Sequence, residues 1–230
     1  MTSKTMTCVS SMATRLILAE LARRYEASGR GAVDIRSMGG VEAARLVRAR
    51  ETADVVVLAS KVMAELETEG HLVAGSIRPF ARSGMAVAVR AGGCRPEIGS
   101  GDAVRRAIMA AGKIGYSTGP SGDHLLSLCE GWGLLPALSE RMIKAPPGVP
   151  VAKLVADGEA DLGFQQLSEL LDAPGVEIVG PLPPEVQATT VFAAGVSAKS
   201  GQAEESQALI AFLASAEADE VERAHGMEPA

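Results

Sequence analysis

The sequence has few aromatic residues, no basic run and no long apolar stretch, and each shortage excludes a class of protein. Aromatic residues make up 3% of the 230 residues, so any core must consist mainly of Ala, Val, Leu and Ile. A net charge of −6 without a cluster of Lys or Arg argues against nucleic acid as a partner. No apolar run approaches the ~20 residues of a membrane-spanning helix, so we expect no membrane insertion.

The amino-terminal segment also lacks the uninterrupted apolar region of a secretory signal. We therefore predict a cytoplasmic protein, or a periplasmic one if a signal peptide has been removed. Cys8, Cys94 and Cys129 are odd in number and lack CxxC spacing, which predicts three small buried side chains. Neither a GxGxxG nor a GxxxxGK[ST] motif is present, and we expect no cofactor.

Strand-like and helix-like patterns alternate along the chain. Segment 53–60 is almost continuously apolar, as expected for a strand covered on both faces in a parallel sheet. Expected strands are 5–11, 32–37, 53–60, 83–93, 113–118, 141–146, 160–166, 176–185 and 189–197, and the later expected helices are 102–111, 122–131, 149–157, 167–171, 203–213 and 216–225. Such alternation predicts an α/β fold with right-handed crossovers.

The carboxyl ends of these strands share one chemical character. In open α/β sheets ligands bind beyond those ends. Hydroxyl-bearing residues, amides and glycines predominate there, and Asp, Glu, His and aromatic residues are absent, so these ends suit neither a metal ion nor a stacked sugar. Helix starts offer free N–H groups and a partial positive charge, so their convergence predicts an anion site.

The stretch "STGPSG" (117–122) shows this character most clearly. We expect Ser117, Thr118 and Ser121 to donate to a ligand, with Gly119 and Gly122 letting the backbone approach it. The alternative is an ordinary helix start capped by Ser121 after a Gly-Pro turn.

Several motifs resemble the type II periplasmic-binding-protein fold, specifically the molybdate-binding-protein-like solute-binding proteins. "SSM" resembles the family's first anion-binding loop and places its serine on Ser11. "SMGGVEAARLV" resembles the second loop, and "GPSGDHLL" resembles a Pro-Ala-Gly loop, which places a backbone contact on Ser121. The "ADV" strand and the run from Val149 to Gly163 also match. The resemblance covers nearly the whole chain.

Two departures from the family pattern bear on the ligand. The second-loop serine falls on Gly40, although Ser37 can replace it, and the tyrosine that closes the molybdate pocket falls on Gln166. Arg15 and Arg82 lie near the expected binding loops and hinge, where either can pair with a carboxylate; each can equally be a surface arginine. We therefore expect an organic di- or tricarboxylate rather than molybdate.

The resemblance implies two lobes, each a mostly parallel sheet with flanking helices, joined by two hinge crossovers. We expect lobe one at 1–81 plus 191–230 and lobe two at 82–190, with the ligand in the cleft between them. The candidate ligand-binding residues are Ser10, Ser11, Met12, Arg15, Ser37, Gly39, Gly40, Ser60, Arg82, Ser117, Thr118, Gly119, Ser121, Gly122, Gly148, Val149, Gln165 and Gln166.

Two functions remain open from the sequence. The first is a solute-binding protein for a small anion, with a transporter as partner only if a signal peptide has been removed. The second is a cofactor-free cytoplasmic isomerase of an unsaturated polycarboxylate, because the fold resembles that of aconitate-isomerase-like members. Such a reaction needs a base, for which His124 and, less suitably, Asp123 are the candidates. His124 can equally be a surface or packing residue.

Overall fold

The computed structural model describes residues 5–230 and divides the chain into two compact units. Unit 1 comprises Met1–Ser83 and Val191–Ala230, and unit 2 comprises Gly84–Thr190. The chain leaves unit 1 within strand β4 (Arg78–Arg90) and returns within strand β9 (Thr189–Val196). The sequence predicted unit boundaries at 81/82 and 190/191, and the structure has them at 83/84 and 190/191.

Unit 1 is an α/β layer structure built around strands β1, β2 and β3. Its sheet runs β2-β1-β3-β9, in which β1 pairs in parallel with β2 and β3, and β9 is antiparallel to β3. A short terminal strand, β10, pairs antiparallel with β4. The elements are β1 (Met6–Ser11), η1 (Met12–Thr14), α1 (Arg15–Ala27), β2 (Val33–Met38), α2 (Gly40–Arg48), β3 (Val55–Ala59), α3 (Ser60–Thr68), α9 (Ala203–Leu213), α10 (Asp219–Ala224) and β10 (Glu228–Pro229).

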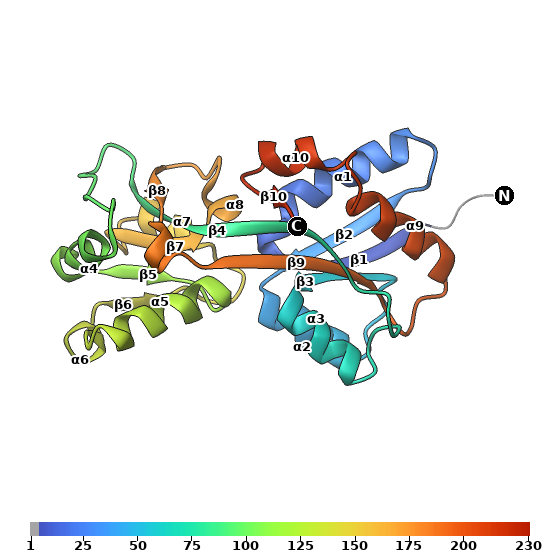
Figure 1. Cartoon of the computed structure of the whole chain (residues 1–230), viewed down its shortest axis with the longest axis horizontal. Helices are drawn as coiled ribbons and strands as arrows, with labels where there is room; N and C mark the ends of the chain where they lie inside the picture. The colour runs from blue at the N-terminus through green and yellow to red at the C-terminus, as the bar shows by residue number, and fades with distance from the viewer. Residues whose placement is uncertain (1–4) are drawn as a thin grey trace. The chain divides into compact units, whose positions relative to one another are not determined.

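Strand β3 explains why this unit needs helices on both sides of its sheet. Its side chains alternate between the two faces, and Val55 and Val57 pack in one core cluster while Val56 and Leu58 pack in another. Helices α1, α9 and α10 cover the first face and α2 and α3 the second (Figure 1). The expectation that segment 53–60 is covered on both faces is therefore confirmed.

Unit 2 repeats this organisation with shorter strands. Its sheet runs β6-β5-β7-β4-β8; β5 is parallel to β6 and β7, whereas β4 is antiparallel to β7 and β8. Helices α4, α5 and α6 cover one face, and α7 and α8 cover the other. The elements besides β4 are α4 (Gly101–Ala110), β5 (Ile114–Tyr116), α5 (Pro120–Gly131), α6 (Leu135–Leu138), β6 (Met142–Lys144), α7 (Val151–Ala156), β7 (Leu162–Gln166), α8 (Leu167–Leu170), β8 (Val176–Pro181) and η2 (Pro184–Val186).

The predicted α/β class is confirmed, with corrections of detail. The sheets are mixed rather than mostly parallel, because β4 and β9 run antiparallel to their neighbours. The strand expected at 83–93 begins at Arg78, and the helix expected at 216–225 is confined to Asp219–Ala224. Cys8 and Cys129 are buried as expected, but Cys94 is exposed. No helix in residues 5–230 is long and apolar enough to cross a membrane.

Candidate functional site

In unit 1 the strand ends bring predicted serines together. The parallel register sets Ser10 opposite Ser37 and Ser11 opposite Met38. The hydroxyls of Ser10 and Ser37 lie 2.8 Å apart and share a hydrogen bond. Ser60 begins α3 at the end of the adjoining strand β3. The carboxyl edge of this sheet therefore carries four predicted hydroxyl groups.

Two of these hydroxyls lack a hydrogen-bond partner. The Oγ atoms of Ser11 and Ser60 are buried, yet neither contacts a donor or acceptor in the described part of the chain. Ser11 is only 6% exposed, so water does not satisfy its hydroxyl freely. Because buried polar groups are normally paired, two orphans at one sheet edge indicate a place for a polar ligand.

The helix starts at the same edge also lack side-chain caps. Gly39 precedes α2 and Ala59 precedes α3, and neither residue carries a capping group. Ser11 precedes the 3₁₀ turn η1 but makes no side-chain cap bond. By contrast, Ser100 of unit 2 caps α4 by accepting from the Ala103 N–H. First-turn N–H groups that no side chain caps favour an anion.

The remaining predicted residues of unit 1 differ in their surroundings. Met12 and Gly39 are half-buried at the edge, and a Cβ on Gly40 would meet no atom within 4 Å. Arg15 is exposed on the first turn of α1. Arg82 is exposed as well, and its guanidinium already contacts Glu228 of β10 at 3.0 Å. A ligand carboxylate at Arg82 would have to compete with Glu228.

In unit 2 the predicted "STGPSG" loop is closed on itself. The hydroxyls of Ser117 and Ser121 lie 2.9 Å apart, and Ser117 Oγ accepts from the Gly119 N–H at 3.2 Å. Thr118 and Gly119 are half-buried beside them. A Cβ on Gly122 would lie 1.9 Å from the Ser117 carbonyl oxygen. Gly122 is thus required by the packing of its own loop, which is a reason that the sequence did not reveal.

Residues 115–119, "GYSTG", match the GxSxG pattern of a nucleophile elbow and stand at a strand-to-helix turn. The partners of Ser117 Oγ are Ser121 and the Gly119 N–H, with no histidine or carboxylate among them in residues 5–230. Without a base in contact, this serine is not an activated nucleophile.

The two loop residues predicted before α7 have fewer unused donors. Gly148 has a positive φ of 77°, which suits glycine, and the Val149 N–H donates to Pro146 O at 3.0 Å. Pro150 has no N–H, and the Val151 N–H donates to Gln165 Oε1 at 2.9 Å. This helix start is already largely satisfied from within unit 2.

Gln165 and Gln166 end strand β7 with different partners. Gln165 is fixed by Val151 and donates from Nε2 to Glu169 Oε2 at 2.6 Å. Gln166 donates from Nε2 to Thr190 Oγ1 at 2.7 Å, while its buried Oε1 contacts no partner in residues 5–230. A hydroxyl both donates and accepts, so Thr190 tolerates either orientation of the Gln166 amide. Gln166 therefore keeps one amide atom, an acceptor or a donor according to the orientation, without a partner in the described chain.

Of the two candidate bases, His124 is oriented by a backbone carbonyl, which leaves Nδ1 as the ring nitrogen that can accept a proton. His124 Nε2 lies 2.9 Å from the Val186 carbonyl oxygen, so this nitrogen must carry the proton and donate it. Asp123 is exposed in the first turn of α5. Sequence reasoning missed Glu169 and Thr190, the partners of the two glutamines. Gln165 lies in strand β7 and Glu169 in helix α8, so the i, i+4 rule for residues on one helix does not pair them from the sequence.

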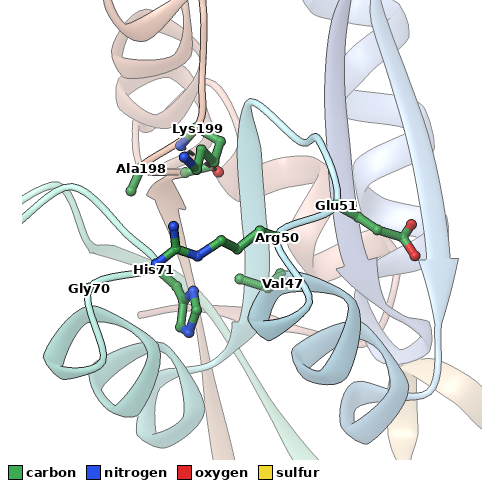
Figure 2. Close-up of a pocket in the computed structure, with 8 residues that line it drawn as sticks. Val47, Arg50, Glu51, Gly70, His71, Ala198 and Lys199 are labelled. Carbon is green, nitrogen blue, oxygen red and sulfur yellow. Dashed lines mark hydrogen bonds between the residues drawn. The ribbon is translucent and has the colours of Figure 1, made fainter.

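A separate pocket lies at the opposite edge of the unit 1 sheet (Figure 2). It has a volume of about 130 Å³ and lies where helices α2 and α3 and strand β9 end. Arg50 points toward His71 and Lys199, while the Glu51 carboxylate points away (Figure 2). Arg50 follows the last turn of α2, where its charge compensates the helix carbonyl end, so the charge by itself needs no ligand to account for it. No group of three or more metal-ligating side chains occurs from Thr5 onward.

Comparison with known proteins places this chain in a family. The model of the bacterial extracellular solute-binding proteins matches residues 6–228. The chain belongs to that family. Its fold is that of the type II periplasmic binding proteins: the periplasmic molybdate-binding protein of Azotobacter vinelandii superposes with a TM-score of 0.81 at 20% identity, over 96% of this chain and 98% of that one. The sulfate-binding protein SubI of Mycobacterium tuberculosis H37Rv gives 0.78 at 17% identity, over 99% and 87%.

This solute-binding-family chain is also similar in sequence to an enzyme. Aconitate isomerase of a Pseudomonas species is 35% identical to it over 98% of this chain and 88% of the relative. That identity is higher than those of the two binding proteins above. The predicted molybdate-binding-protein-like resemblance is thus confirmed, and a relative that carries an isomerase name stands beside it.

Proposed function

We propose that this protein binds a small unsaturated polycarboxylate and isomerises it without a cofactor. The observation that carries the binding half is the pair of buried, unpartnered hydroxyls of Ser11 and Ser60 beside helix starts that no side chain caps. The reaction half is supported by 35% identity to an aconitate isomerase along 98% of the chain.

An organic acid fits these residues better than a tetrahedral metal oxyanion. The family's second-loop serine falls on Gly40, so the hydroxyl at that position is missing, although Ser37 lies at the same sheet edge. Gln166 adds an amide whose two orientations suit a carboxylate oxygen or a protonated acid. Each flat carboxylate group of a ligand accepts two or three hydrogen bonds. The serine hydroxyls and the N–H groups at the helix starts can divide these bonds among several carboxylate groups.

The chemistry is a shift of one proton. A base removes a proton from the CH₂ group next to the double bond, and the electron pair spreads over the three-carbon unit and an adjoining carboxylate. The same proton, or one from solvent, then returns at the other end of that unit, so the double bond moves and no oxidant is needed. N–H and hydroxyl donors stabilise the charge that develops on the carboxylate oxygen.

A second candidate is binding without turnover. The family model, which describes solute-binding proteins, favours it because such proteins need no catalytic group. In that case the ligand class stays the same, and only the proton transfer is absent.

The deciding experiment combines calorimetry with turnover. Tricarballylate, a saturated and unreactive tricarboxylate, reports binding, and trans-aconitate followed by NMR reports isomerisation. We expect tricarballylate to bind, with Ser11→Ala and Ser60→Ala each weakening it about 5- to 150-fold, the equivalent of 1–3 kcal/mol for a hydrogen bond to a charged group. Tight molybdate binding with no response to tricarballylate would refute the ligand class.

The second pocket supplies the matched control. An Arg50→Ala/Lys199→Ala double variant removes two cations of unit 1 without touching the serine edge. It should bind tricarballylate like the wild type. If this variant loses binding and Ser11→Ala does not, the ligand binds at the Arg50/Lys199 pocket and not at the serine edge, which would contradict the proposal. Binding without any turnover of trans-aconitate would select the second candidate.

A further inference from the structure

The pocket at the opposite edge of the unit 1 sheet brings together side chains that can carry positive charge from three segments. Arg50 follows helix α2, His71 follows helix α3, and Lys199 lies in the turn after strand β9. The Arg50 guanidinium points toward His71 and Lys199 (Figure 2). All three residues belong to unit 1, so the pocket lies wholly within one unit.

The two carboxylates beside the pocket are already in use. The Glu69 carboxylate, whose Oε2 lies 3.8 Å from His71 Nε2, accepts two hydrogen bonds from Arg48, at 2.7 and 2.9 Å. The Glu51 carboxylate points away from the pocket, and its Oε2 lies 3.6 Å from Arg36 Nη1 (Figure 2). Each carboxylate therefore has an arginine partner outside the pocket.

Arg50 and Lys199, by contrast, carry charges that nothing nearby neutralises. In the part of the chain that the structure describes, neither the Arg50 guanidinium nor the Lys199 ammonium forms an ion pair or a hydrogen bond. Like charges that converge repel each other, and an anion between them replaces that repulsion with attraction. The pocket is therefore a cavity with unpaired cations on its wall.

The backbone of Arg50 carries a further cost. Arg50 has a φ of 60°, and the Glu51 N–H donates to the Leu46 carbonyl oxygen, which closes α2 in a Schellman motif. This left-handed position favours glycine, because a side chain strains it. Five other helices end in the same motif, each with glycine at that position: Gly29, Gly70, Gly133, Gly158 and Gly226. Compensation of the helix carbonyl end explains a positive charge after α2, but it does not explain an arginine on a strained backbone.

From these observations we propose that this pocket is a second anion site, which binds a phosphate-type dianion. Its volume of about 130 Å³ admits a small anion. Arg50 offers a planar fork of donors, Lys199 offers three rotatable donors and His71 offers a ring N–H. Because these donors come from three segments, a tetrahedral anion can present an oxygen to each of them. The site is separate from the serine edge and from the proposed isomerisation.

Thermal unfolding with inorganic phosphate, compared with sodium chloride at equal ionic strength, tests the site. Phosphate should raise the unfolding temperature of the wild type, because a ligand of the folded state stabilises it. Arg50→Gly removes both the charge and the strain. Without phosphate this variant should unfold at the wild-type temperature or above, and it should lose the rise with phosphate. Arg23→Gln removes an exposed cation of α1 and is the matched control, which should keep the rise.

Calorimetry with inorganic phosphate then locates the site. Lys199→Gln should weaken phosphate binding about tenfold, the equivalent of one hydrogen bond to a charged group. Ser11→Ala should bind phosphate like the wild type, because its hydroxyl lies at the other edge of the sheet.

Three results would overturn the inference. If Ser11→Ala loses phosphate binding and Arg50→Gly keeps it, phosphate binds at the serine edge. If Arg50→Gly is less stable without phosphate and responds to phosphate like the wild type, Arg50 serves only the end of α2. If sodium chloride raises the unfolding temperature as much as phosphate does, the cations are merely screened and hold no specific anion.

Discussion

The strand ends of the two units are built from similar residues but are satisfied to different degrees. In unit 1 the Ser11 and Ser60 hydroxyls lack partners in the described chain, and the helices behind them start without caps. In unit 2 Ser117 and Ser121 bond each other, and Gln165 is held between Val151 and Glu169. Unit 1 therefore has hydroxyl groups without partners at its strand ends, whereas the corresponding side chains of unit 2 orient one another.

The largest expected effect comes from a substitution that disrupts the loop at residues 117–122 of unit 2. Gly122→Ala would place a Cβ 1.9 Å from the Ser117 carbonyl, so the loop or the start of α5 must move. We expect the free energy of unfolding to fall by about 3 kcal/mol or more, as for other severe steric clashes. Urea denaturation measures it. Gly119→Ala is the control, because its Cβ would lie 3.8 Å from Ser117 Oγ, an ordinary contact; an equal loss in both variants would contradict the explanation.

The serines of the two units should respond oppositely. Ser11→Ala removes an unpaired buried hydroxyl, so it should cost tricarballylate affinity by roughly 1–3 kcal/mol but leave stability unchanged or slightly higher. Ser121→Ala breaks the bond to Ser117, so it should lower stability by about 1 kcal/mol and affect affinity less. Calorimetry and thermal unfolding of both variants test the contrast, which fails if their profiles are the same.

A third polar group of unit 1 without a partner in the described chain, the Glu222 carboxyl, lies in the core, and its burial should lower the stability of the folded protein. Glu222 is 1% exposed, its Oε2 contacts no partner within residues 5–230, and burial, with a smaller contribution from Asp219, raises its pKa to about 7. The unfolded chain ionises near 4.5, so the folded state binds the extra proton between these values. Stability should therefore fall as the pH rises from about 4.5 to 7 and then level off.

Glu222→Gln should remove that dependence. At pH 8 the variant should be more stable than the wild type by roughly 1–3 kcal/mol, because one pKa unit corresponds to about 1.4 kcal/mol. At pH 4 the difference should vanish. Denaturant midpoints of both proteins at the two pH values provide the measurement. If the stability difference between the variant and the wild type is the same at pH 4 and pH 8, Glu222 is not held protonated.

The smallest expected effect comes from adding a hydroxyl at Gly40, on the serine edge of unit 1. A Cβ on Gly40 would meet no atom within 4 Å, so Gly40→Ser should fold normally and restore the hydroxyl that the resemblance places there. We expect molybdate or sulfate to bind roughly tenfold better, about the value of one hydrogen bond to an anion, with tricarballylate little changed. Calorimetry with both anions decides it; no gain would mean that Gly40 does not face the ligand.

The sequence determined the class and order of the fold because periodicity is local information. The apolar run at 53–60 predicted a strand covered on two faces, which the structure confirms. The serine-rich and glycine-rich strand ends predicted a ligand site, which stays a prediction. Those inferences need only the rule that apolar side chains are buried and that ligands meet the carboxyl ends of strands. The short helix α6 and the terminal strand β10 were missed because their patterns are too brief.

Tertiary structure alone decided which polar groups are in use. The sequence offered Ser11 and Ser121 as ligand contacts and His124 as a candidate base. Packing leaves the Ser11 hydroxyl unpaired in the described chain, bonds Ser121 to Ser117 and bonds His124 to the Val186 carbonyl. It likewise revealed the hydrogen bonds that direct Gln165 toward Glu169. Hydrogen bonds depend on distances between residues remote in sequence, and those distances exist only after the sheets have formed.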